Sequence, residues 1–101
     1  MPDERTRAVA ERFGANLRRI RRREGLSQER LAALSSLHRT EIGKLERGER
    51  VARFDTLIRL SGAMAVPLGE LLDGIDWLPG PETSGTFAIA VGPMPRRRCA
   101  G

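Results

Sequence analysis

Apolar residues recur every three or four positions through most of the chain, which is the period of an amphipathic helix. The clearest stripe consists of Val9, Phe13, Leu17 and Ile20. It predicts a first helix over residues 3–24 or 12–24, and both starts stay open because Gly14 weakens the early part. Gly25 follows as a stop signal.

Four shorter helices are predicted after Gly25, over residues 28–34, 39–46, 54–64 and 68–72. Ser27 is in place to act as the N-cap of the first of them. Only the short segment 35–37 separates the first two, so the turn between them must be tight. The residues expected to face the core are Leu31, Ala32, Leu34, Ile42, Leu45, Phe54, Leu57, Ile58 and either Leu60 or Ser61.

The pattern changes after residue 76. The run Leu78-Pro79-Gly80-Pro81 excludes a helix, whereas residues 86–91 are β-prone and alternate large with small apolar side chains. We therefore predict an all-α, five-helix domain over residues 1–76 and a C-terminal extension over 77–101 that forms one β-strand. Trp77 is expected to close the end of the helical core. The alternative for the extension is an unstructured tail.

The charge is concentrated in the first half of the chain. The net charge is +5, but residues 5–59 contain 14 Arg, one Lys and 7 acidic residues, whereas residues 60–95 contain four acidic residues and no base. Such a distribution fits a polyanionic partner. It also fits an ordinary solvated helix surface, so charge alone does not decide between the two.

Several function classes are excluded or disfavoured. One Cys and one His in 101 residues allow neither an internal disulfide nor a zinc site, and we expect no cofactor. There is no nucleophile–His–acid set and no glycine-rich phosphate loop, so an enzyme is not expected. No run approaches the roughly 18 apolar residues of a membrane span, and the lone Cys99 is compatible with the reducing cytoplasm.

Two short helices joined by a tight turn, the second exposing polar residues, form the helix-turn-helix pattern. Three segments make it specific: Leu26-Ser27-Gln28, Ile42-Gly43-Lys44-Leu45-Glu46-Arg47-Gly48, and Leu68-Gly69-Glu70-Leu71-Leu72. In this order and spacing they resemble the Cro/phage-repressor-like, or xenobiotic-response-element (XRE), helix-turn-helix family. The resemblance covers about residues 13–75. It implies a lambda-repressor-like fold that binds double-stranded DNA and regulates transcription.

The resemblance also implies roles for individual residues. An ion pair between Arg21 and Glu46 is expected to tie the first helix to the third. Residues expected to face bases are Arg39, Thr40, Gly43 and Lys44. Residues expected at the DNA phosphates are Ser27, Gln28, His38, Arg47, Arg50 and Arg53.

Alternatives stay open for several of these residues. Arg39 suits a bidentate contact with guanine or a phosphate contact, and Thr40 and Lys44 suit bases or phosphates equally. His38 also suits a place at the start of the third helix or in the turn. The arginine run 18–23 is more often a solvated helix face, although part of it is expected to border the DNA backbone.

The sequence departs from the family pattern in the turn, where the family often has glycine and this chain has Ser35 and Ser36. It also departs at Arg53, where a Ser or Thr cap is usual, and in the extension. An unpaired strand leaves its backbone groups unsatisfied. We therefore predict that residues 86–91 pair with a second copy across a two-fold axis, with Trp77, Phe87, Ile89 and Val91 as dimerisation residues.

The function that follows is sequence-specific DNA binding by a homodimer on a near-palindromic operator. The first alternative is a protein-binding module, such as an antitoxin that grips a partner through its helices and tail. The second is a co-regulator that bridges proteins without reading DNA.

Overall fold

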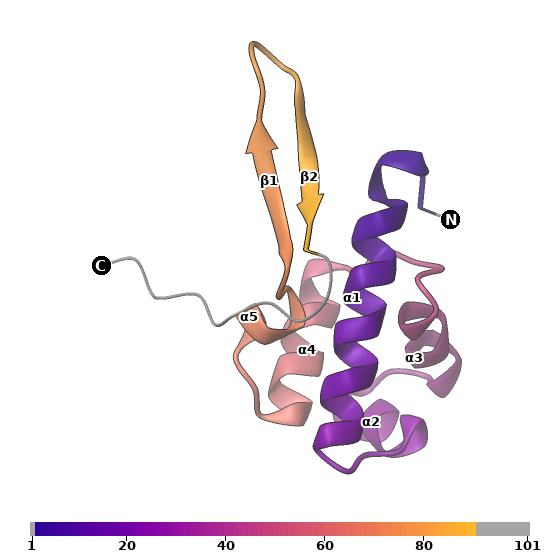
Figure 1. Ribbon diagram of the computed structural model, residues 1–101. Helices are drawn as coiled ribbons and strands as arrows, with labels where there is room; N and C mark the ends of the chain where they lie inside the picture. The colour runs from indigo at the N-terminus through magenta and orange to yellow at the C-terminus, as the bar shows by residue number, and fades with distance from the viewer. Residues whose placement is uncertain (1, 91–101) are drawn as a thin grey trace.

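The structure is a computed structural model that describes residues 2–90. In this range five helices precede two strands. Figure 1 shows the helices gathered into one body, with the strands projecting from it as a hairpin. The elements are α1 (Glu4–Arg23), α2 (Gln28–Ser35), α3 (Arg39–Glu46), α4 (Phe54–Met64), α5 (Leu68–Leu71), β1 (Ile75–Pro79) and β2 (Gly85–Ile89).

Local capping explains where the helices begin and end. The Asp3 side chain accepts a hydrogen bond from the backbone N–H of Thr6, which fixes the longer of the two predicted starts of α1. Ser27 caps α2 as predicted, since its hydroxyl accepts from the N–H of Arg30 at 3.0 Å. After α1, Gly25 has a φ of 72°, a left-handed conformation that favours glycine.

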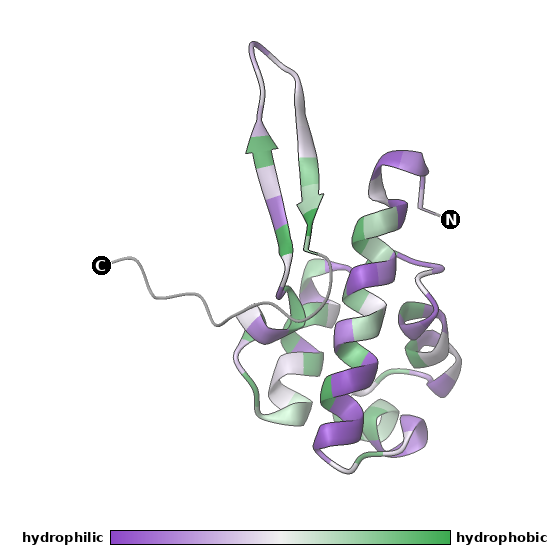
Figure 2. Ribbon diagram, viewed as in Figure 1, coloured by the Kyte–Doolittle hydropathy of each residue, from purple (hydrophilic) through white to green (hydrophobic). Residues whose placement is uncertain are grey.

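The core lies between α1 and the four shorter helices. Its fully buried large residues include Leu17, Ile20, Leu31, Ile42, Leu45, Leu60 and Leu71. Figure 2 shows the contrast along α1, where hydrophobic positions alternate with a strongly hydrophilic surface near its C-terminal end. The predicted apolar stripe is thus the core side of α1.

Three residues predicted to face the core do not. Phe54 is 74% exposed, and Ile58 and Leu34 are also exposed. For Phe54 and Ile58 the physical reason is that α4 buries only one narrow side, through Thr56, Leu60 and Met64. Phe54 and Ile58, one turn apart, therefore lie on a second apolar side that faces solvent in the single chain. Leu34 lies outside the side of α2 that is buried through Leu31, Ala32 and Ser35.

The helices α1 and α3 approach closely at Gly14. A Cβ added to Gly14 would lie 2.3 Å from the carbonyl oxygen of Leu45 and 2.6 Å from that of Glu46. Only a glycine allows the two backbones to come this near. The residue that weakens the early part of α1 as a helix former is therefore required for its packing.

The C-terminal extension corrects the all-α prediction. The predicted lone strand is β2, and it pairs antiparallel with β1 of the same chain. The register sets Trp77 opposite Phe87 and Ile75 opposite Ile89. The expectation that this strand lacks a partner within the chain was wrong, because the Pro- and Gly-containing segment between the strands forms a reversal. Val91 lies outside the described residues.

Trp77 is not part of the helical core, contrary to the prediction. It is 47% exposed, and its ring packs edge-on against Phe87 with centroids 5.0 Å apart. A Cβ at Gly85 would lie 2.3 Å from an indole carbon, so the indole lies across this glycine. The aromatic pair therefore stabilises one face of the hairpin while leaving much of the indole in solvent.

Side chains of α1 anchor the base of the hairpin. Arg12 donates from Nε to the carbonyl oxygen of Asp73 and from Nη1 to that of Ala90, both at 3.1 Å. Asn16, which is buried, donates from Nδ2 to the carbonyl oxygens of Leu71 and Asp73 at 3.0 and 2.8 Å. The hairpin thus has a fixed origin on the helical body. Within the described range, no helix has the length and apolar content to cross a membrane.

Candidate nucleic-acid interface

The turn between α2 and α3 forms without glycine. Ser36 takes the left-handed conformation, with a φ of 56° and a ψ of 40°. The backbone N–H of Leu37 then donates to the carbonyl oxygen of Ala32 at 2.9 Å. The Ser35 hydroxyl is buried and donates to the carbonyl oxygen of Leu31 at 2.6 Å. These bonds hold the two helices at a tight turn and so brace α3 against α2.

The third helix exposes its first turn. Arg39 and Thr40 are exposed and Lys44 is half-buried, so all three have a side open to solvent. Gly43 is buried, and a Cβ there would lie 3.0 Å from Nη1 of Arg47. The Arg47 guanidinium covers Gly43 in the free protein, and a base could approach Gly43 only after that side chain moved.

Arg39 is held by a residue that the sequence analysis did not single out. Its Nη1 lies 3.2 Å from Oε1 of Glu29, which is in the first turn of α2. The two side chains are 64% and 68% exposed, so the pair is weak and DNA can displace it. In the free protein, Glu29 is the acidic partner of Arg39. No local pattern indicated this pairing, since Glu29 is at the start of α2, at the far end from the turn, and ten positions separate it from Arg39.

The predicted pair of Arg21 and Glu46 lies beneath the helix-turn-helix. Arg21 Nη2 is 3.0 Å from Oε1 of Glu46, and a second bond joins Nε to Oε2 at 2.5 Å. These hydrogen bonds raise the pKa of Arg21 above its usual range. Gln28 Nε2 donates to the same Oε1 at 3.1 Å. One carboxylate therefore fixes α1, the start of α2 and the end of α3 relative to each other.

The other predicted phosphate ligands lie around this unit. His38 precedes α3 at the N-cap position and is exposed, but its side chain makes no capping hydrogen bond. Arg50 is exposed in the loop after α3. Arg53 Nε lies 3.2 Å from Oδ1 of Asp55. Arg47 pairs with Glu49, and the hydrogen bond from Arg47 lowers the pKa of the Glu49 carboxyl.

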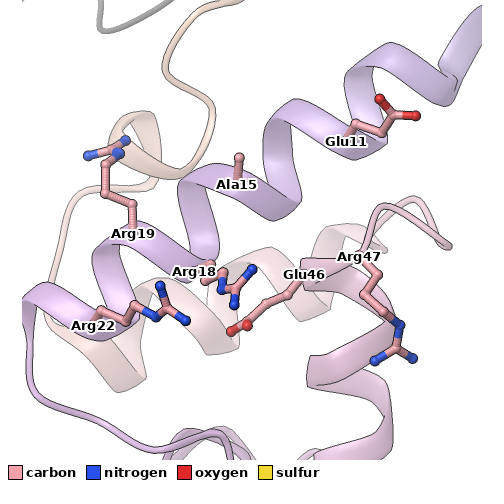
Figure 3. A pocket seen from close by; sticks show the side chains of 7 residues that line it. All are labelled: Glu11, Ala15, Arg18, Arg19, Arg22, Glu46 and Arg47. Atoms are coloured by element: carbon pink, nitrogen blue, oxygen red, sulfur yellow. The ribbon is translucent and has the colours of Figure 1, made fainter.

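A second group of arginines, on α1, is close to this unit. Arg18 and Arg22 line a pocket of about 430 Å³ together with Glu46 and Arg47 of the α3 end (Figure 3). The sequence analysis expected part of the arginine run 18–23 to border the DNA backbone but did not single out Arg18 or Arg22. Their spacing of four residues, which places both on one side of a helix, was a usable signal.

This geometry is that of a helix-turn-helix protein: a braced helix exposes Arg39, Thr40 and Lys44, and basic residues surround it. A sequence profile of the helix-turn-helix family matches residues 17–71, more than half of the chain. The chain belongs to this family, in its Cro/phage-repressor-like (XRE) branch, and is a sequence-specific DNA-binding regulator of transcription.

Its relatives include control proteins. The control protein C.SmaI of Serratia marcescens is 44% identical over 64 residues, which are 63% of this chain and 76% of that protein. The control protein C.BamHI of Bacillus amyloliquefaciens is 42% identical over 62 residues, which are 60% of this chain and 76% of that protein.

A solved structure confirms the helical fold. The crystal structure of the restriction-modification controller protein C.AhdI from Aeromonas hydrophila superposes with a TM-score of 0.62 at 41% identity. The superposition covers 63% of this chain and 97% of C.AhdI. The remainder of this chain therefore has almost no counterpart in C.AhdI.

Proposed function

We propose that the protein represses or activates transcription as a homodimer that binds a two-fold-symmetric operator, with α3 of each copy in the major groove. In this proposal residues 1–76 bind DNA and residues 77–101 hold the two copies together. The observation that carries it is the exposed first turn of α3, where Thr40 is open to solvent and Arg39 contacts Glu29 in the first turn of α2. Arginine side chains at this place reach guanine O6 and N7.

The proposed phosphate contacts surround the reading helix. Gln28 is fixed by Glu46 at the first turn of α2, where backbone N–H groups also point outward. Arg50 and Arg53 are exposed in the segment between α3 and α4. Contacts of this kind set the register of the protein on the duplex without reading its sequence.

The hairpin supports the dimer. An isolated two-stranded hairpin is marginally stable in water, and this one projects from the helical body with Trp77 and Leu78 exposed (Figure 1). Pairing with the hairpin of a second copy would cover the indole and the strand edges. Of the other residues proposed to mediate dimerisation, Phe87 and Ile89 are in β2. The competing surface for a second copy is the exposed apolar side of α4, with Phe54 and Ile58.

The control proteins suggest the regulated genes. C.AhdI is a restriction-modification controller, and we propose that the present chain controls a restriction-modification operon in the same way. Immunoprecipitation of the cross-linked protein from its own cells, followed by sequencing, tests this. Recovery of the promoter of a restriction or modification gene is expected, whereas promoters of unrelated genes alone would contradict it.

Selection of bound sequences from random duplex DNA tests the core of the proposal. We expect an enriched palindrome whose half-sites are about 10 base pairs apart, or a multiple of that spacing. Binding should weaken steeply as salt rises, through counterion release. Recovery of no motif, with binding that salt leaves unchanged, would instead favour a protein-binding module.

A further inference from the structure

We propose that Arg18 and Arg22, with Arg47 at the rim, form a phosphate-binding site between α1 and the end of α3. The ligand class is a phosphate group, and the source that the observations favour is the DNA backbone beside the reading helix. This inference deepens the proposed function, since it adds a contact to the same DNA and assigns residues of α1 to it.

The shape and charge of the pocket carry the proposal. Its lining holds four arginines and two glutamates in about 430 Å³. Figure 3 shows the Arg18 and Arg22 guanidinium groups on the side of α1 that faces Glu46, whereas Arg19 points away from it. Ala15, on the same wall, is short and leaves the space open.

Neither glutamate of the lining, Glu11 or Glu46, forms an ion pair with Arg18 or Arg22. The Glu46 side chain is only 4% exposed and is engaged by Arg21 and Gln28. Within residues 2–90, neither Arg18 nor Arg22 has an ion pair. Two like charges four residues apart destabilise an isolated helix. A phosphate between the two guanidinium groups would remove that repulsion and accept several charge-assisted hydrogen bonds.

The position of Glu46 links this pocket to the DNA-binding surface. The same carboxylate that walls the pocket receives the hydrogen bond from Gln28 at the first turn of α2. The α3 end also contributes Arg47 to the lining. The pocket is therefore at the end of the reading helix, where a flanking DNA strand supplies phosphates. A free phosphate or a nucleotide has the same chemistry and is the other source to test.

The test compares two double variants of the full chain. Arg18→Ala/Arg22→Ala removes the pocket charges, and Arg5→Ala/Arg7→Ala removes the same charge from exposed positions of the same helix. We expect the pocket variant to lower the slope of log affinity against log salt by about 1–2, and equally on the operator and on a mutated operator. The control should keep the wild-type slope. Because all four side chains are exposed, neither variant should melt below the wild-type protein.

A second measurement separates the two sources of phosphate. Inorganic phosphate is titrated into the DNA-free protein while the Arg Nε–H signals are followed by NMR. Saturable shifts of Arg18 and Arg22, together with a wild-type salt slope in the pocket variant, would show the site with a free phosphate as its ligand. No shifts and no change of slope would overturn the proposal. If the wild-type protein selects no operator, the proposed function fails. The phosphate titration would still show whether Arg18 and Arg22 bind a phosphate group.

Discussion

Arg21 and Glu46 form a bidentate ion pair across the seam between α1 and α3, and their side chains are only 10% and 4% exposed. Twenty-five residues separate them in the sequence. The pair matters because the Glu46 carboxylate also accepts a hydrogen bond from the Gln28 side chain. The start of α2 and the end of α3 are thus oriented by one carboxylate, and the orientation of the helix-turn-helix depends on it.

The first prediction is that Glu46→Ala strongly destabilises the protein. Removing the carboxylate leaves the Arg21 guanidinium buried without its counter-charge, which costs about 3–5 kcal/mol. The free energy of unfolding from urea titration measures this. A loss of only about 0–1 kcal/mol, the value for an exposed pair, would show that the pair opens to water in solution. Glu49→Ala, which removes a carboxylate from an exposed pair, is the matched control.

The second prediction concerns the contact of α1 with α3. Gly14→Ala should destabilise the protein by about 1–3 kcal/mol, because the new methyl group meets backbone oxygens that cannot rotate away. Gly62→Ala on α4 is the control, since a Cβ there meets nothing within 4 Å. It should stabilise α4 by up to about 1 kcal/mol through helix propensity. Equal melting temperatures for the two variants would contradict the close approach.

The sequence predicted the helical part of the fold well, because caps and stops coincide with the apolar period. The bounds of α3 and α4 were predicted correctly, and Ser27 caps α2. Phe54 and Ile58 were misplaced because one helix can carry two apolar sides, and periodicity does not say which side meets the core. The sequence predicted that the turn is tight but not its backbone conformation. Ser36 takes the left-handed conformation, which is uncommon for a residue other than glycine.

Only one strand of the hairpin, β2, was predicted from the sequence. Residues of β2 alternate clearly, but β1 is five residues long, follows α5 almost directly and ends in Pro79. Such a segment lacks the alternation that identifies a strand, and its proline argues against one. The anchoring of its base by Arg12 and Asn16 joins positions 55–78 residues apart in the sequence, and no local pattern reports such contacts.

The third prediction separates base reading from phosphate binding. Arg39→Ala should relax the preference at one operator position and cost about 1–3 kcal/mol there. Arg50→Ala should weaken binding evenly across sequences and lower the salt slope by about 1. Affinities on an operator series with single base changes measure both. If the two variants give the same profile across the series, Arg39 binds phosphate and does not read a base.

The last prediction locates the surface between two copies. Trp77→Thr removes a large, half-exposed apolar ring but keeps a residue that favours strands, and the base of the hairpin stays anchored by Arg12. Ile58→Thr makes a similar change on α4, at a residue that is 53% exposed against 47% for Trp77. Sedimentation velocity over a range of concentrations measures the oligomeric state of each full-length variant.

If the hairpins join the two copies, Trp77→Thr should raise the dimer dissociation constant by at least about tenfold, which corresponds to about 1.4 kcal/mol. This free-energy change is smaller than the binding free energy that the burial of a whole aromatic ring contributes. Ile58→Thr should then sediment as the wild type does. Because two reading helices about 34–36 Å apart must bind one face of the duplex together, the Trp77 variant should also bind a full operator little better than a half-site. The reverse result, a monomeric Ile58 variant beside a dimeric Trp77 variant, would move the interface to α4.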